Sequence, residues 1–136
     1  MAAELFVDTS AWYPLAVRRD PAHGKVASVL RERIRHGARV VTTNLIVAET
    51  HALLLRRTTR AAALAFVHYV GQPPNLIVYG TLALDVQAVA DWLGPYDDQD
   101  FSFADAVSFA VMVERGITDA LALDRHFVSA GFRALP

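Results

Sequence analysis

The 136-residue sequence contains no cysteine, and lysine occurs once, at Lys25. The absence of thiols excludes a disulfide framework, a cysteine-ligated metal centre and a thiol nucleophile, and it is typical of cytoplasmic proteins. The longest apolar runs, such as residues 53–55 and 61–67, are too short to span a bilayer. Residues 1–4 carry no basic segment ahead of an apolar stretch, so no signal peptide is predicted and we expect a cytoplasmic protein.

Hydrophobic residues make up 54% of the chain, which is enough for a packed core and argues against disorder. The length is typical of one domain. There is no internal repeat, low-complexity tract or linker. We therefore expect residues 1–136 to form a single domain.

The net charge of −1 gives no argument for a nucleic-acid partner, but the charges are segregated along the chain. Ten of the 13 basic residues lie between Arg18 and Arg60, and nine of the 14 acidic residues lie between Asp85 and Asp124. This pattern is expected of a basic rim beside an acidic centre that holds a cation. Ordinary solvated helix faces would explain the charges alone equally well.

Short apolar segments alternate with segments of helical periodicity. The predicted strands cover residues 5–7, 40–42, 76–79 and 120–123, with a short fifth strand near Phe132. The predicted helices run from Ser10 to about Pro14, and over residues 21–36, 44–57, 59–70, 81–93 and 102–115, with a last helical turn after Asp124. This alternation predicts an α/β fold with a parallel sheet covered on both faces, a three-layer α/β/α sandwich.

Two carboxylates directly follow predicted strands. Asp8 ends the first strand and Asp124 ends the fourth. Parallel sheets of this class bind ligands at the carboxyl ends of their strands, so these positions indicate a site. Each aspartate could instead simply cap the helix that follows it.

Two further carboxylates lie on predicted helices. Glu49 has only apolar residues three and four positions away, so we expect it on an apolar face without a partner on its own helix. A buried lone charge must pair, protonate or hold a cation. Asp105 follows Ser102 by three residues, which is the spacing of a capping box and would by itself explain that aspartate.

Together the acids Asp8, Glu49, Asp105 and Asp124 form an oxygen-only set of candidate ligands that suits Mg²⁺, with Mn²⁺ as the alternative. Such ions activate water and stabilise the attacking and leaving oxygens in phosphodiester cleavage. No histidine has the spacing of a zinc site, and we interpret all five as surface or structural polar groups: His23, His36, His51, His68 and His126.

The sequence resembles the PIN domain, and within it the VapC-type toxins. The matching segments are Val7-Asp8-Thr9-Ser10, Ala48-Glu49, residues 100–109 (DFSFADAVSF), Leu123-Asp124-Arg125-His126-Phe127 and Ala130-Gly131-Phe132. They are collinear and span nearly the whole chain. Their order and spacing together are more specific than any one of them.

The resemblance implies strand order 3-2-1-4-5, Mg²⁺-dependent endoribonuclease activity, a homodimer, and a cognate antitoxin that blocks the site. It implies that Asp8 and Asp105 are the principal metal ligands and that Glu49 and Asp124 complete the acidic set. Thr9, Ser10 and Ser102 are then candidate hydrogen-bond donors around the acids. The chain departs from many relatives at Ala104 and Ala122, where they carry hydroxyl residues.

Three other functions are alternatives to a PIN-domain nuclease. A haloacid-dehalogenase type of phosphatase needs a second carboxylate two residues after Asp8, where this chain has Ser10. A receiver-type signalling domain needs an acidic pair and a lysine after the last strand, and Lys25 lies elsewhere. A catalytically inactive PIN-like RNA-binding or scaffold protein stays open as the alternative.

The RNA path is expected to run over the clustered arginines. This set comprises Arg31, Arg33, Arg35, Arg39, Arg56, Arg57 and Arg60, and we expect Arg39, Arg56 and Arg57 to bind the RNA. Some of these arginines would instead meet the antitoxin or the dimer partner.

Overall fold

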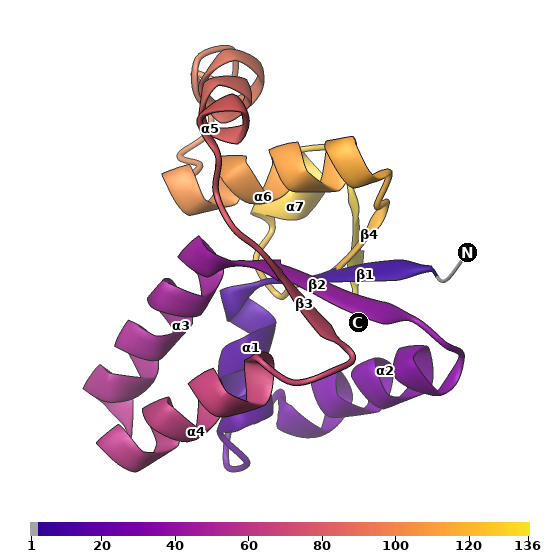
Figure 1. Ribbon diagram of the computed structural model, residues 1–136, viewed down its shortest axis with the longest axis vertical. Coiled ribbons are helices and arrows are strands. Elements are labelled where there is room, and N and C mark those ends of the chain that lie inside the picture. The colour runs from indigo at the N-terminus through magenta and orange to yellow at the C-terminus, as the bar shows by residue number, and fades with distance from the viewer. Residues whose placement is uncertain (1–2) are drawn as a thin grey trace.

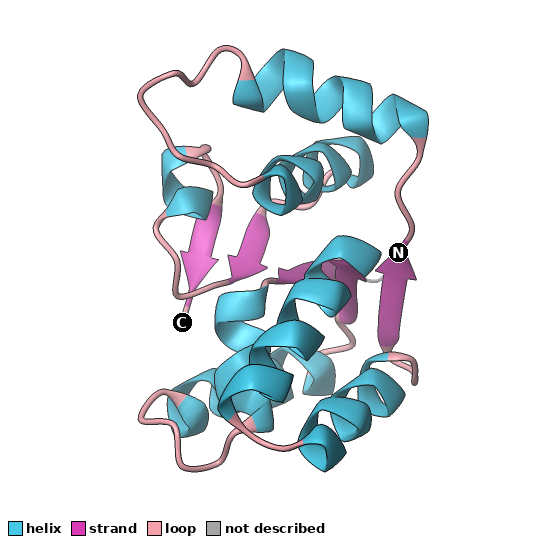
Figure 2. Cartoon of the chain, turned by 90° about the vertical axis from the view of Figure 1, so that its left-hand side faces the viewer, coloured by secondary structure: helices cyan, strands magenta, loops and turns pink. Residues whose placement is uncertain are grey.

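The computed structural model describes residues 3–136 and contains one five-stranded parallel sheet (Figures 1 and 2). Its strands are β1 (Glu4–Val7), β2 (Arg39–Thr43), β3 (Asn75–Val78), β4 (Asp119–Leu121) and β5 (Arg133–Leu135). Their order in the sheet is β3-β2-β1-β4-β5, and every neighbouring pair is parallel. The expected strand order is therefore confirmed, and β1 and β4 lie side by side.

Helices cover both faces of the sheet, which confirms the three-layer sandwich (Figure 1). One layer holds α1 (Thr9–Ala16), α2 (His23–Arg35), α3 (Asn44–Arg57) and α4 (Arg60–Val70). The other holds α5 (Leu82–Ala88), its π-helical extension η1 (Val89–Leu93), α6 (Phe103–Arg115) and α7 (His126–Ser129). Within residues 3–136, no helix combines the length and apolarity needed to cross a membrane.

Four helices begin at a side-chain cap, one of them at the predicted capping box of Ser102. The side chains of Thr43, Thr59, Thr81 and Ser102 each accept a hydrogen bond from the backbone N–H three residues later. These bonds satisfy donors that the first helical turn leaves free. The starts of α3, α4, α5 and α6 are thus set by local sequence.

Three element boundaries differ from the prediction. Helix α1 continues through Pro14 to Ala16, because a proline near the end of a helix removes only one backbone hydrogen bond. Helix α2 begins at His23, after a turn in which the Asp20 carboxylate accepts from Ala22 N at 2.9 Å. Strand β4 ends at Leu121, so Asp124 lies on the turn beyond the strand.

The core is densest around β1 and α6. Leu5, Phe6 and Val7 are fully buried, as expected of a central parallel strand covered on both faces. Phe109 of α6 packs edge-on against Phe127, with ring centroids 5.0 Å apart. This packing fixes the start of α6 against the segment after β4, and both carry candidate site residues.

Candidate active site

Asp8 lies at the carboxyl end of β1 and caps α1. The side chain is 3% exposed, and its Oδ2 accepts hydrogen bonds from Ser10 N at 3.1 Å and Ser10 Oγ at 2.7 Å. Burial raises the pKa of Asp8 to about 6, and the charges of Asp105 and Glu49 add to the rise, while the Ser10 hydrogen bonds partly offset it. Asp8 is therefore a helix cap, and its ionised form is also less stable here than it would be in water.

Asp105 lies in the first turn of α6, and the predicted capping box is present. Its Oδ2 accepts from Ser102 N at 3.1 Å, and Ser102 Oγ accepts from Asp105 N at 3.0 Å. Burial raises the pKa of Asp105, and the charge of Asp124 adds to that, against opposing hydrogen bonds from Ser102 and His126. The capping role does not exclude a functional one, since Asp105 and Asp8 are close enough to raise each other's charging cost.

Glu49 differs from its expectation. The residue is exposed, and its Oε1 accepts a hydrogen bond from Thr9 Oγ1 at 2.6 Å. Thr9 Oγ1 in turn accepts from the fully buried Thr50 Oγ1 at 3.1 Å. The expectation of a buried apolar face was wrong, because spacing along α3 does not tell which side of the helix faces the core. The expectation that Glu49 has no partner on its own helix agrees with its described contact, since Thr9 lies on α1.

Ser10 connects the turn after β4 to the loop after β1. Its Oγ accepts from Leu123 N at 2.9 Å and from Asp124 N at 3.3 Å, while it donates to Asp8. The Asp124 carboxylate accepts from His126 N at 2.8 Å. The three predicted donors Thr9, Ser10 and Ser102 thus each donate a hydrogen bond to one acid of the set, Ser102 through its backbone N–H.

His126 is the site residue that the sequence analysis missed. Its Nδ1 lies 2.9 Å from Asp105 Oδ2 and 3.2 Å from Asp124 Oδ1, and its Nε2 lies 3.1 Å from Asp100 Oδ1. Burial lowers the pKa of His126, but the charges of Asp124 and Asp105 and the hydrogen bonds to Asp100 and Asp105 outweigh it, and the net shift is upward. Its position two residues after Asp124 was the available signal.

The donor chemistry of this edge fits a hard divalent cation. Asp8 and Asp105 are buried carboxylates, and neither has an arginine or lysine partner among the ion pairs of the described residues. Within residues 3–136, however, no group of three or more aspartate, glutamate, histidine or cysteine side chains lies close enough together to hold a metal ion. Oxygen ligands and an excess of negative charge suit Mg²⁺, and the carboxylates would have to move closer together to enclose it.

The candidate RNA-binding arginines separate into two groups. Arg39 begins β2 and lies 3.8 Å from Glu4 Oε2. It is therefore at the amino ends of the strands, whereas Asp8 lies at their carboxyl ends. This placement contradicts its expected role beside the acids, because the strand carries it away from them. Arg56 and Arg57 lie exposed in the last turn of α3, the helix that carries Glu49, and Arg57 lies 5.8 Å from the centre of the Tyr13 ring.

The sheet order and the acidic carboxyl edge define the class to which the chain belongs. The PIN domain family model matches residues 5–133, and the chain is a member of the PIN domain family.

The chain is 37% identical over 128 residues to the protein named 23S rRNA-specific endonuclease VapC20 of Mycobacterium tuberculosis, in strains CDC 1551 / Oshkosh and ATCC 25618 / H37Rv. The match covers 94% of this chain and 95% of the relative.

A crystal structure of Mycobacterium tuberculosis VapC20, described as a sarcin-ricin loop cleaving toxin, matches with a TM-score of 0.85 and 36% identity. That match covers 94% of this chain and 95% of the other. Together these findings confirm the prediction of a PIN-domain ribonuclease of the VapC toxin type.

Proposed function

We propose that this chain is a Mg²⁺-dependent endoribonuclease and the toxin of a toxin–antitoxin pair. The observation that carries the proposal is the pair of buried carboxylates, Asp8 and Asp105, which belong to one hydrogen-bonded cluster and have no arginine or lysine partner among the described residues. Helix capping alone would not require two buried carboxylates without an arginine or lysine partner, since burying negative charge is costly. A bound divalent cation would offset it.

In the proposed mechanism, Asp8 and Asp105 hold the ion, and Asp124 and Glu49 complete the acidic set. The ion, when bound, supplies water activation and stabilises the oxygens of the phosphodiester. Ser10 and Ser102 occupy one oxygen of Asp8 and one of Asp105, so the other oxygen of each is available to face the site. Glu49, exposed and held by Thr9, is placed to orient the attacking water.

The proposed substrate is a loop of large-subunit ribosomal RNA. The support is the relative named as a 23S rRNA-specific endonuclease, which matches over 94% of this chain, together with the structure described as a sarcin-ricin loop cleaving toxin. Loops present unpaired bases and backbone that a protein groove can recognise. Its site of action would then be the cytoplasm, where ribosomes are found.

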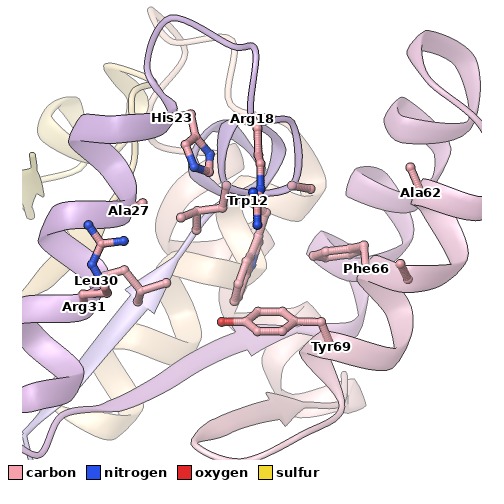
Figure 3. A pocket seen from close by; sticks show the side chains of 12 residues that line it. Trp12, Arg18, His23, Ala27, Leu30, Arg31, Ala62, Phe66 and Tyr69 are labelled. Atoms are coloured by element: carbon pink, nitrogen blue, oxygen red, sulfur yellow. The ribbon is translucent and has the colours of Figure 1, made fainter.

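The antitoxin is proposed to dock in a groove of about 950 Å³ between α1, α2 and α4 (Figure 3). Trp12, Phe66 and Tyr69 give the groove an apolar wall, and Arg18 and Arg31 add positive charge to it. This combination fits an amphipathic segment that carries acidic residues. Trp12 lies one helical turn from Asp8 on α1, so a segment that fills the groove could continue to the acids.

The homodimer is proposed to form through the outer face of α5 and η1. Leu82, Val86 and Val89 recur at helical spacing and are 79%, 59% and 52% exposed. An unpartnered apolar stripe of this kind is typical of an interface. Sedimentation of wild-type protein and of Val86→Asp tests this surface, and an unchanged dimer in the variant would assign the interface elsewhere.

The activity is tested by incubating ribosomes and a sarcin-ricin loop transcript with the purified protein in Mg²⁺ or in EDTA. We expect one dominant cut that requires Mg²⁺, with 5′-phosphate and 3′-hydroxyl ends mapped by primer extension and ligation. Cyclic 2′,3′-phosphate ends would refute the mechanism, because they arise from attack by the 2′-hydroxyl of the RNA. Cleavage by the Asp8→Asn protein at the wild-type rate would refute the site.

A further inference from the structure

His126 occupies the centre of the acidic edge. Its two ring nitrogens face three aspartates, and these come from three segments: the loop before α6, the first turn of α6, and the turn after β4. The side chain is 16% exposed, and the ring packs edge-on against Phe101 with centroids 5.4 Å apart. The orientation of the ring is therefore fixed from several sides.

We propose that His126 is a positioning residue of the nuclease site, which orients the Asp105 and Asp124 carboxylates through Nδ1 and is itself oriented by Asp100 at Nε2. The inference deepens the proposed function and rests on it.

The physical reason lies in how an aspartate side chain rotates. The terminal torsion of aspartate is broad, so a carboxylate held at only one point can turn away from its productive orientation. Asp105 Oδ2 has two donors, Ser102 N at 3.1 Å and His126 Nδ1 at 2.9 Å, which together fix the plane of the carboxylate. Asp124 Oδ1 accepts a hydrogen bond from the backbone N–H of His126 at 2.8 Å and lies 3.2 Å from Nδ1, an electrostatic contact that favours this orientation.

Asp100 supplies the other end of this chain of contacts. It is the member of the loop after η1 whose carboxylate reaches His126 Nε2, at 3.1 Å. Its hydrogen bond to a ring edge stops rotation of the imidazole, as carboxylates commonly do for histidines in metal sites. Asp98 is an exposed acid of the same loop and gives a matched comparison, since it is absent from the His126 contacts.

Three replacements of His126 separate the two ring nitrogens. In Asn the amide N–H lies near the place of Nδ1, in Gln it lies near the place of Nε2, and Leu keeps apolar bulk against Phe101 without any donor. If the Nδ1 contacts matter, His126→Asn recovers the larger part of what His126→Leu loses, whereas His126→Gln stays close to His126→Leu. A role in packing alone predicts that Leu is tolerated as well as Asn.

The first readout uses the RNA-free protein. Melting curves over a Mg²⁺ titration give the concentration of half-maximal stabilisation, which we expect to rise about 10-fold to 100-fold in His126→Leu, as for other partners that orient metal ligands. The second readout is kinetic: kcat should fall by a similar factor, whereas KM for the RNA stays within about twofold. Asp100→Asn should shift the Mg²⁺ midpoint in the same direction by a smaller factor, and Asp98→Asn should leave it unchanged.

Two results would overturn the inference. One is a His126→Leu protein with the wild-type Mg²⁺ midpoint and kcat. The other is a His126→Asn protein as impaired as His126→Leu, which would deny any part to the Nδ1 contacts. The Asp8→Asn protein, measured alongside, distinguishes these outcomes from failure of the proposed function: if it cleaves and responds to Mg²⁺ as the wild type does, the site itself is misassigned.

Discussion

Acids at the two ends of the parallel strands have different ionic partners. We call the end where the strands begin the amino edge and the end where they finish the carboxyl edge. At the amino edge, Glu4 accepts hydrogen bonds from Arg115 at 3.0 and 2.7 Å. Asp119, at the same edge, lies 2.7 Å from Arg33 and 3.9 Å from Arg133. At the carboxyl edge, the cationic partner of Asp105 within residues 3–136 is a histidine, His126.

The pKa values of Glu4 and Asp8 move in opposite directions. The hydrogen bonds from Arg115 lower the pKa of Glu4, whereas burial raises the pKa of Asp8 to about 6. Acids that pair with an arginine of the chain stabilise the fold. Acids without such a partner remain available to bind a divalent cation from solution. Strongly perturbed carboxylates in one cluster are a marker of a functional site.

The largest expected effect separates the edges by activity. Asp8→Asn should lower kcat on the order of a thousandfold, because several kcal/mol of transition-state stabilisation depend on the bound ion. Asn caps helices about as well as Asp, so the fold should be retained. Glu4→Gln, the matched loss of one carboxylate at the other edge, should keep kcat within about twofold. A similar loss of kcat in both variants would remove the distinction.

In the metal-free protein, Asp8 and Glu4 should change the free energy of unfolding in opposite directions as the pH rises. The folded-state pKa of Asp8 is raised, so its favourable contribution is complete below its unfolded pKa of about 4 and is lost as pH rises through about 6. The loss is on the order of 3 kcal/mol, from a shift of about two units at 1.36 kcal/mol each. Glu4 has a lowered pKa, so its contribution is present at neutral pH and is lost on acidification.

Denaturant unfolding in EDTA between pH 4 and pH 7 measures both effects. The Asp8→Asn protein should gain stability over wild type as pH rises, whereas Glu4→Gln should lose it. An Asp8→Asn advantage that does not change with pH would show that charge on Asp8 is not the cause.

Mg²⁺ should stabilise variants at the amino edge but not the Asp8→Asn variant at the carboxyl edge. Mg²⁺ at a hundredfold excess over its dissociation constant should stabilise the wild type by about 2.7 kcal/mol, because the ion binds only the assembled site. The same rise is expected in Glu4→Gln, and most of it should vanish in Asp8→Asn. Thermal melts with EDTA and with Mg²⁺ measure it, and a full Mg²⁺ response in Asp8→Asn would place the ion elsewhere.

The smallest expected effect concerns the exposed arginines in the last turn of α3, the helix that carries Glu49. Replacement of both Arg56 and Arg57 by alanine should lower the salt slope of RNA binding by about two units, one per lost phosphate contact. Replacement of Arg133, which lies outside the predicted RNA path and is 3.9 Å from Asp119, is the control and should leave the slope unchanged. Equal slopes in wild type and the double variant would place the RNA path elsewhere.

Local features were predictable because their partners lie close in sequence. The caps at Thr43, Thr59, Thr81 and Ser102 depend on contacts over three residues, and all are present. The strands follow from apolar runs, and Asp8 was placed correctly because it directly follows one of them. The strand order itself came from resemblance, since nothing local specifies which strands are neighbours.

The sequence by itself thus determined the alternation of elements and the capped helix starts, and it predicted the four acids. The tertiary structure alone decided the partners of those acids: Thr9 and Glu49 are 40 residues apart, His126 and Asp105 are 21 apart, and Ser10 and Leu123 are 113 apart. It also decided that Glu49 is exposed and that Arg39 belongs to the opposite edge. Periodicity gives the spacing of side chains along an element, but only packing against other elements fixes which side is buried and which residues meet.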